Sequence, residues 1–226
     1  EDGFKVICAA RRLDRLEALA TEIGGVPVQC DVTNSDDIAR LASIAGPSVS
    51  LLVNNAGGAI GSDSIENADL EVWQRMYDTN VLSVVRVTRA LLPALRAARG
   101  AVITVSSTAG RNVYEGGGGY AAAKHGTRVV VETLRLELNG EPVRVTEVAP
   151  GMVHTEEFSL VRFGGDHARA DAVYADVDRP LVAADVAEVI RWIASLPEHV
   201  NIDSIVVRPV AQAAQFKTHR GPIFDS

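Results

Sequence analysis

The chain has 226 residues, of which 47% are apolar, and its formal net charge is -7 at neutral pH. This length suits a single folded domain with a substantial core. The negative charge disfavours nucleic acid and anionic membranes as partners, and no apolar run has transmembrane length, so we expect neither partner.

The cysteines and the N-terminus indicate the compartment. Cys8 and Cys30 both lie in apolar, strand-like runs, and we find no signal peptide. We interpret the two cysteines as reduced, buried thiols rather than a disulfide, and we expect a cytoplasmic protein. No Cys/His cluster has the spacing of zinc ligands, so no metal site is predicted.

Strand and helix patterns alternate along the whole chain. Apolar runs of strand length occur at residues 4–10, 26–30, 49–53, 101–106, 143–148 and 204–208. Helical patterns occur at residues 13–23, from Asn34 or Ser35 to about 44, and at 70–98, 120–138 and 185–196. We expect an interruption of the third helix near Pro93 and a loop at residues 116–119. Continuous apolar strands between helices predict a single-domain, Rossmann-like, doubly wound α/β fold over residues 1–226, with a parallel sheet covered on both faces by helices.

Residues suited to chemistry follow five of the predicted strands. They are Arg11, Asp31, the run Asn54-Asn55-Ala56-Gly57, Ser107, and Pro150-Gly151. In doubly wound sheets, ligands lie beyond the carboxyl ends of the strands. The sequence therefore predicts one shared crevice.

The central stretch pairs a phenol with an ammonium group. Tyr120 and Lys124 are four residues apart in a predicted helix and therefore lie on one face, opposite Ser107 at a strand end. An ammonium about 5 Å from a phenol, at an effective dielectric constant of ~20, favours the phenolate by ~3 kcal/mol, which lowers a tyrosine pKa by about two units. Such a tyrosine is suited to general acid/base chemistry, and Ser107 would polarise a carbonyl oxygen.

Each of these features also has a purely structural interpretation. The Tyr-x-x-x-Lys spacing arises by chance on surface helices. The run from Asn54 to Gly57 could be a turn, Asn80 could bend a helix, and Pro150-Gly151 could end a strand. Asp31 could be a neighbour of a helix cap. The functional interpretation depends on the whole set occurring together.

With Asn54-Asn55-Ala56-Gly57, Asn80, Ser107, Tyr120-x-x-x-Lys124 and Pro150-Gly151 in this order, the chain resembles the short-chain dehydrogenase/reductase family. The resemblance covers nearly the whole chain, and the spacing of 13 residues from Ser107 to Tyr120 fits it. It implies a nicotinamide-dependent oxidoreductase. Tyr120 would be the general acid/base, Lys124 would bind the nicotinamide ribose and lower the tyrosine pKa, Ser107 would hold the substrate oxygen, and Asn80 would complete a proton relay through water.

The resemblance also implies a cofactor site. Asp31 and Val32 would meet the adenine, and the run containing Asn54, Ala56 and Gly57 would lie along the cofactor. Pro150, Gly151, Val153 and Thr155 would lie toward the nicotinamide end, beside Tyr120 and Lys124. The resemblance further implies a homotetramer built on the helices of Asn80 and Tyr120.

The sequence departs from the family pattern at its start. It lacks the first strand and the Thr-Gly-x-x-x-Gly-x-Gly loop that let the backbone approach a pyrophosphate. Glu1-Asp2-Gly3-Phe4 resembles the end of the first helix and the start of the second strand. We expect about 25 to 30 further residues in the natural protein, because a domain needs its central strand. The alternative is a truncated chain that binds cofactor poorly, and an intact mass near 24.0 kDa would favour it.

The end of the first predicted strand favours NADP over NAD. An NAD site carries an acidic residue there, whereas this chain has Ala10 followed by Arg11 and Arg12. A guanidinium can bind a 2′-phosphate through paired hydrogen bonds. In the alternative, the two arginines are solvated charges at a helix start.

The C-terminal third resembles bacterial NADP-dependent 3-hydroxy acid dehydrogenases, which act on serine, allo-threonine and malonic semialdehyde. The resemblance rests on residues 157–166, 196–202 and 209–212. Residues 152–180 form the expected substrate-side lid. Within it, Arg162 is the favoured partner of a substrate carboxylate, with Arg169 and His154 as other candidates. Arg111, just past Ser107, is a candidate from the opposite wall. A salt bridge from Arg162 to Asp166 is the structural alternative.

Other functions remain open at this stage. The chain could be a carbonyl reductase with an unrelated small-molecule substrate, or a non-catalytic nucleotide-binding protein. The second would predict the loss of Ser107, Tyr120 or Lys124, and all three are present. An epimerase or dehydratase would normally need a larger substrate region than residues 152–180.

Overall fold

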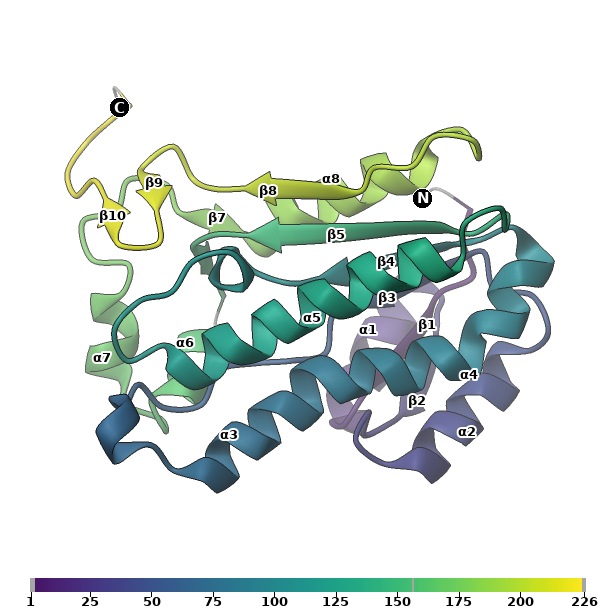
Figure 1. The fold of residues 1–226 in the computed structure, drawn as a ribbon, viewed down its shortest axis with the longest axis horizontal. Helices are drawn as coiled ribbons and strands as arrows, with labels where there is room; N and C mark the ends of the chain where they lie inside the picture. Colours follow the sequence, from purple (N-terminus) through teal and green to yellow (C-terminus); the bar gives the residue numbers. More distant parts are fainter. Residues whose placement is uncertain (1–2, 156, 225–226) are drawn as a thin grey trace.

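A computed structural model describes residues 3–155 and 157–224 (Figure 1). The sequence interpretation of Glu1 and Asp2 lies outside the described residues. Within these ranges, none of the helices combines the length and the apolar character needed to cross a membrane.

Two groups of parallel strands form the centre of the molecule. β1 (Ile7–Ala10) pairs with β2 (Val26–Gln29). The larger group has the order β3 (Leu51–Asn54), β4 (Ala101–Val105), β5 (Arg144–Pro150), β8 (Ser204–Val207). All these pairings are parallel, as expected for strands connected through helices. The predicted doubly wound α/β fold is confirmed.

Helices cover both faces of this sheet. They are α1 (Leu13–Ile23), α2 (Ser35–Ala45), α4 (Ser83–Ala98), α5 (Gly118–Glu137) and α8 (Ala183–Ser195). Neighbouring residues of a strand point to opposite faces. Accordingly, Val102 packs with Leu91 and Leu95 of α4, whereas Ile103 packs with Ile193 of α8. Figure 1 shows α4 and α5 side by side in front of the larger sheet, with α8 behind it.

Local signals set the ends of the first helices. Gly24 ends α1 with a φ of 67°, a conformation that glycine adopts without steric cost. Asn34 is the N-cap of α2, because its side-chain oxygen accepts hydrogen bonds from the backbone N–H groups of Asp36 and Asp37. Ser35 is therefore the first residue of the helix.

The long helical region is interrupted at a different place from the predicted one. Pro93 lies inside α4, where its neighbours Leu91, Ala94 and Leu95 are buried. Packing of this apolar face outweighs the helix-breaking tendency of proline. The break is a π-helical turn, η2 (Asp78–Leu82), which joins α3 (Leu70–Tyr77) to α4.

The expectation that residues 116–119 form a loop is also wrong for the last two of these glycines. Gly118 and Gly119 form the first turn of α5. A Cβ atom at Gly119 would lie 2.5 Å from Cε of Met76 and 2.9 Å from the Trp73 ring. These glycines therefore let the start of α5 pack closely on α3, and this contact supplies the stability that their helix propensity lacks.

The segment after β5 forms small elements at the carboxyl ends of the strands. They are β6 (Val153–His154), α6 (Phe158–Arg162), α7 (His167–Ala172) and β7 (Leu181–Val182), with β9 (Gln212–Ala214) and β10 (Lys217–Thr218) beside them (Figure 1). The short 3₁₀ turns η1 (Ile65–Asn67) and η3 (Thr108–Gly110) follow β3 and β4. The lid contacts the loop after β3: Gly61 N–H donates to the Arg162 carbonyl oxygen at 2.8 Å, and Arg169 donates to Ser62 Oγ at 2.8 Å.

Candidate active site

Ser107 and Tyr120 meet at the carboxyl end of β4. Ser107 is the N-cap of η3 and accepts a hydrogen bond from the Ala109 N–H at 3.1 Å. Tyr120, in the first turn of α5, is buried, and its ring meets the ring of Phe158 edge-on from the lid at 5.8 Å. Ser107 lies close enough to Tyr120 for side-chain hydrogen bonding to act on the phenol and to oppose the rise of its pKa. The predicted juxtaposition of serine and tyrosine is therefore present.

Lys124 lies one helical turn after Tyr120 and is buried. Its ammonium donates to the carbonyl oxygen of Val105, the last residue of β4, at 3.2 Å. Burial lowers the pKa of Lys124 to about 8, and the carboxylate of Glu147 acts in the opposite direction. The side chain is thus a cation at neutral pH that is held against the strand end.

The pKa of Tyr120 departs from the expected direction. Burial raises it to about 12, and the hydrogen bond from Ser107 opposes this change only partly. The sequence predicts a lowered Tyr120 pKa only from the attraction between the phenolate and the ammonium group of Lys124. That prediction omits the desolvation of a phenol enclosed by α3, α5 and the lid, which disfavours the phenolate.

Asn80 is fixed by the π-helical turn. Its amide donates to the carbonyl oxygens of Gly58 and Met76 at 2.9 and 2.8 Å, and its Oδ1 accepts from the Gly58 N–H at 3.1 Å. The backbone oxygen of Asn80 accepts from Thr127 Oγ1 of α5 at 2.8 Å. π-Helical turns are frequent at functional sites because they redirect backbone groups in this way.

Gly57 marks a close approach beside this amide. A Cβ atom there would lie 2.5 Å from Asn80 Oδ1 and 3.4 Å from Lys124 Nζ. The backbone after β3 therefore passes directly over Asn80 and Lys124. Only glycine leaves space at this point.

The other residues predicted to bind cofactor lie at strand ends with partners within the protein. The Asn54 amide donates to Thr88 Oγ1 at 3.0 Å, and Asp31 accepts from the backbone and hydroxyl of Thr33 at 2.9 and 2.7 Å. These Thr33 hydrogen bonds hold the pKa of Asp31 below its usual value. Val32 packs against the core, and Ala56 is exposed.

The strand end at Pro150 and Gly151 leads into the lid. The Met152 N–H donates to Gln212 Oε1 at 2.8 Å, which ties this turn to β9. Further along, the Val153 carbonyl accepts from the Tyr174 hydroxyl, and Thr155 Oγ1 accepts from the Phe158 N–H at 3.4 Å. These contacts set the course of the lid away from the sheet.

The arginines that follow β1 have different surroundings. Arg11 lines a cavity of about 630 Å³ together with Asp31, Asp37 and Arg40. Arg12 forms two parallel hydrogen bonds with the carboxylate of Glu157 in the lid, at 2.6 and 2.7 Å, and Arg15 contacts the same carboxylate. The two arginines together hold the pKa of Glu157 below its usual value.

Arg162, the lid residue predicted to bind a substrate carboxylate, lies where the lid contacts the loop after β3. The Arg162 guanidinium lies over the ring of Tyr114 at 5.5 Å, and its Nε donates to the Gly61 carbonyl at 3.3 Å. Its positive charge is close enough to lower the pKa of Tyr120. The expected salt bridge from Arg162 to Asp166 is not formed, and Asp166 is the N-cap of α7, where its Oδ1 accepts from the Arg169 N–H.

Arg111 and His154, two further candidates for binding a substrate carboxylate, have different surroundings. Arg111 turns to the buried carboxylate of Glu147 and to Ser204, so it does not face Tyr120 as a substrate cation. His154 is exposed, and its ring centre lies 4.4 Å from that of the Tyr174 ring, with the two rings tilted.

Within residues 3–155 and 157–224, no group of three or more His, Cys, Asp or Glu side chains is placed to hold a metal ion. Cys8 and Cys30 are both buried, free thiols, as expected.

Sequence reasoning missed Glu147 and Glu157. Both are carboxylates whose arginine partners are distant along the chain. A carboxylate within the apolar run of β5 was the available signal for Glu147, since buried charges require partners.

Comparisons with known proteins agree with this geometry. The short chain dehydrogenase family model matches residues 1–162. An uncharacterized oxidoreductase of Mycobacterium tuberculosis is 54% identical, over 98% of this chain and 87% of its own. Serine 3-dehydrogenase of Rhizobium radiobacter is 41% identical, over 97% and 90%, and an NADP-dependent 3-hydroxy acid dehydrogenase of Salmonella typhimurium is 40% identical, over 97% and 91%. The solved closed form of a serine dehydrogenase complexed with NADP⁺ superposes with a TM-score of 0.89 at 39% identity, over 96% of this chain and 90% of that one.

Proposed function

Given that the chain belongs to the short-chain dehydrogenase family, we propose that it is an NADP(H)-dependent oxidoreductase that interconverts a hydroxyl and a carbonyl on a small 3-hydroxy acid. The observation that carries the proposal is the meeting of Ser107, Tyr120 and Lys124 at the end of β4. The similarity to serine and 3-hydroxy acid dehydrogenases supports the substrate class.

The three side chains divide the chemistry of the reacting oxygen. At neutral pH, Tyr120 holds its proton, because its pKa is raised to about 12. It therefore donates this proton to a carbonyl oxygen during reduction and recovers one from the hydroxyl during oxidation. Ser107 donates a hydrogen bond to the same oxygen, and Lys124 provides the positive charge that favours the phenolate left behind. Asn80 would complete the relay by holding a water that passes protons to Lys124.

The residues present fit a phosphorylated nicotinamide cofactor. Gly57 lets backbone pass closely over Asn80 and Lys124. Lys124 would bind a hydroxyl of the nicotinamide ribose. Arg12 already forms the paired geometry with a carboxylate that it would use with a 2′-phosphate, and Arg11 lines the neighbouring cavity with Asp31. When bound, the cofactor supplies or accepts the hydride. Pro150, Gly151, Val153 and Thr155 would border its nicotinamide end.

The position of Arg162 in the lid supports the proposal that the substrate carries a carboxylate. Arg162, the last residue of α6, is close enough to Tyr120 to influence its pKa, and its side-chain partners among the described residues are the Gly61 carbonyl and two aromatic rings rather than a carboxylate. Its planar guanidinium can bind a carboxylate through two hydrogen bonds. A substrate held between Arg162 and Tyr120 would carry its carboxylate one carbon beyond the carbinol carbon, as in serine, allo-threonine and malonic semialdehyde.

A spectrophotometric assay tests this function. Absorbance at 340 nm follows NADPH consumption with malonic semialdehyde and with uncharged carbonyls, and NADP⁺ reduction with serine and allo-threonine. We expect the 3-hydroxy acids and their aldehydes to be preferred. Turnover of uncharged carbonyls alone would indicate a broad carbonyl reductase, and cofactor binding without any turnover would indicate a non-catalytic protein.

We further expect a homotetramer in the cytoplasm. α5 exposes the apolar side chains of Val129 and Leu136, which suits burial against another subunit. Light scattering should give four times the protomer mass. Cell fractionation tests the location, and a monomer or a membrane-associated protein would contradict these expectations.

A further inference from the structure

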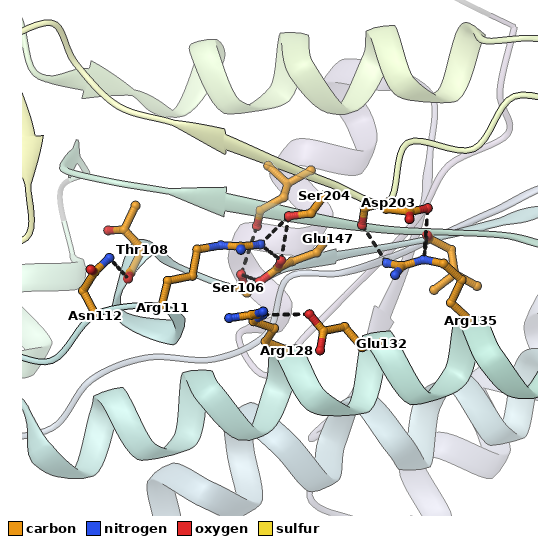
Figure 2. Close-up of polar contacts among 12 residues, drawn as sticks. Ser106, Thr108, Arg111, Asn112, Arg128, Glu132, Arg135, Glu147, Asp203 and Ser204 are labelled. Carbon is orange, nitrogen blue, oxygen red and sulfur yellow. Dashed lines mark hydrogen bonds and ion pairs between the residues drawn. The ribbon is translucent and has the colours of Figure 1, made fainter.

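A buried carboxylate lies directly behind the catalytic serine. Glu147 is on β5, and only 2% of the residue is exposed. It accepts hydrogen bonds from Ser106 Oγ at 2.5 Å and from Ser204 Oγ at 2.7 Å, and it forms an ion pair with Arg111 (Figure 2). A buried carboxylate is costly unless such partners satisfy it, so a role is expected for it.

The partners of Glu147 lie on both sides of the serine turn. Ser106 immediately precedes Ser107, and Arg111 immediately follows η3. One carboxylate therefore holds both ends of the six-residue stretch from Ser106 to Arg111. This arrangement fixes the turn in which Ser107 faces Tyr120.

The same carboxylate acts on Lys124. Its charge raises the lysine pKa against the effect of burial. The charged and titratable groups around this centre are Glu147 from β5, Arg111 from the end of η3, and Tyr120 and Lys124 from α5. Tyr114 from the loop before α5 and Arg162 from α6 also act on Tyr120. β8 contributes the neutral Ser204, whose hydroxyl Arg111 also contacts.

We propose that Glu147 is a positioning residue for the oxidoreductase site: its carboxylate holds Ser106 and Arg111 on either side of Ser107, next to Val105, whose carbonyl oxygen accepts from Lys124. The proposal rests on the proposed function, because Ser107 and Lys124 are its reacting groups. No part of it requires Glu147 to touch substrate or cofactor.

The first experiment measures turnover in charge and length variants. Glu147→Gln keeps the side-chain shape and removes the charge. It should lower kcat by about 10- to 100-fold with little change in the KM for NADPH, because small displacements of reacting groups are costly. Glu147→Asp, which keeps the charge but is shorter, should recover part of this loss. The matched control is Glu132→Gln, which removes an exposed carboxylate that pairs with Arg128 on α5, and it should leave kcat unchanged (Figure 2).

The second experiment measures the pKa of Lys124 directly. The chain has three lysines, Lys5, Lys124 and Lys217, so NMR titration of protein labelled at the lysine ε-carbon gives few signals. Glu147→Gln should lower the Lys124 pKa by roughly one pH unit, because a nearby negative charge is lost. Arg111→Met should raise it, because the carboxylate of Glu147 then loses the positive charge that neutralises it. Glu147→Asp and Glu132→Gln should leave it close to the wild-type value.

These outcomes separate a positioning role from simple destabilisation. A destabilised fold lowers the thermal midpoint but does not move the Lys124 pKa in opposite directions in Glu147→Gln and Arg111→Met. An unchanged Lys124 pKa together with an unchanged kcat in Glu147→Gln would overturn the proposal, as would pKa shifts of the same sign in both variants. The titration uses neither substrate nor cofactor, so it remains decisive even if Tyr120→Phe retains activity and the proposed function fails.

Discussion

The ammonium nitrogen of Lys124 lies 5.8 Å from the centre of the Tyr120 ring. Both side chains are buried, and burial shifts their pKa values in opposite directions, down from 10.5 to about 8 for the lysine and up from 10.0 to about 12 for the tyrosine. In both residues the cost of burying a charge is the largest cause. At neutral pH the pair therefore consists of a neutral phenol beside a cation, which is the protonation state of a proton donor.

Tyr120→Phe should fold and bind NADPH but lose at least ~100-fold in kcat, because the proton donor is removed while the ring remains. Turnover at 340 nm and cofactor affinity by fluorescence titration measure the two effects separately. Tyr77→Phe, which removes a hydroxyl from a half-exposed tyrosine on α3, is the control. A Tyr120→Phe enzyme with wild-type kcat would rule out the proposed acid/base role.

Lys124→Met should be more stable than the wild type at pH 7 and should show almost no turnover. The folded-state pKa of Lys124 is about 8 against 10.5 in a model peptide, so the unfolded chain binds more protons between these values. Wild-type stability from this group therefore rises with pH in that window, by up to about 3 kcal/mol. The stability difference between variant and wild type should shrink from pH 8 to 10.5 in urea unfolding. A difference that does not depend on pH would contradict the lowered pKa.

Arg11→Ala should weaken NADP⁺ binding by roughly 10- to 150-fold and leave NAD⁺ binding nearly unchanged, as expected for the loss of charged hydrogen bonds to a phosphate. Arg12→Ala is a useful comparison, because Arg12 also binds Glu157 and its loss should loosen the lid as well. Isothermal titration with both cofactors measures the ratio. Equal losses for NADP⁺ and NAD⁺ would show that Arg11 does not read the 2′-phosphate.

Arg162→Gln should raise the KM for serine and other 3-hydroxy acids and spare the reduction of an uncharged carbonyl. The substitution removes the positive charge that the lid places near Tyr120, and an uncharged substrate does not need that charge. The control is Arg169→Gln, which removes a lid arginine bound to Ser62. If Arg162→Gln reduced both activities in equal proportion, the residue would support the lid rather than bind a carboxylate.

Local pattern determined much of the fold and the core of the site. Apolar runs marked the strands, Gly24 marked the end of α1, and Asn34 marked the start of α2. Tyr120 and Lys124 share a helical face because residues four apart always do, and Ser107 follows a strand because its run is continuous and apolar. These features depend only on neighbours along the chain, so the sequence alone was sufficient to predict them.

Only the tertiary structure decided which distant groups meet. Glu147 lies 36 residues from Arg111, and Glu157 lies 145 residues from Arg12, so no periodicity relates these partners. The position of the π-helical turn at Asn80, rather than a break at Pro93, depends on contacts with Gly58 and α5. The direction of the Tyr120 pKa was misjudged for the same reason. Desolvation depends on everything that packs around the phenol, and this enclosure exists only in the folded chain.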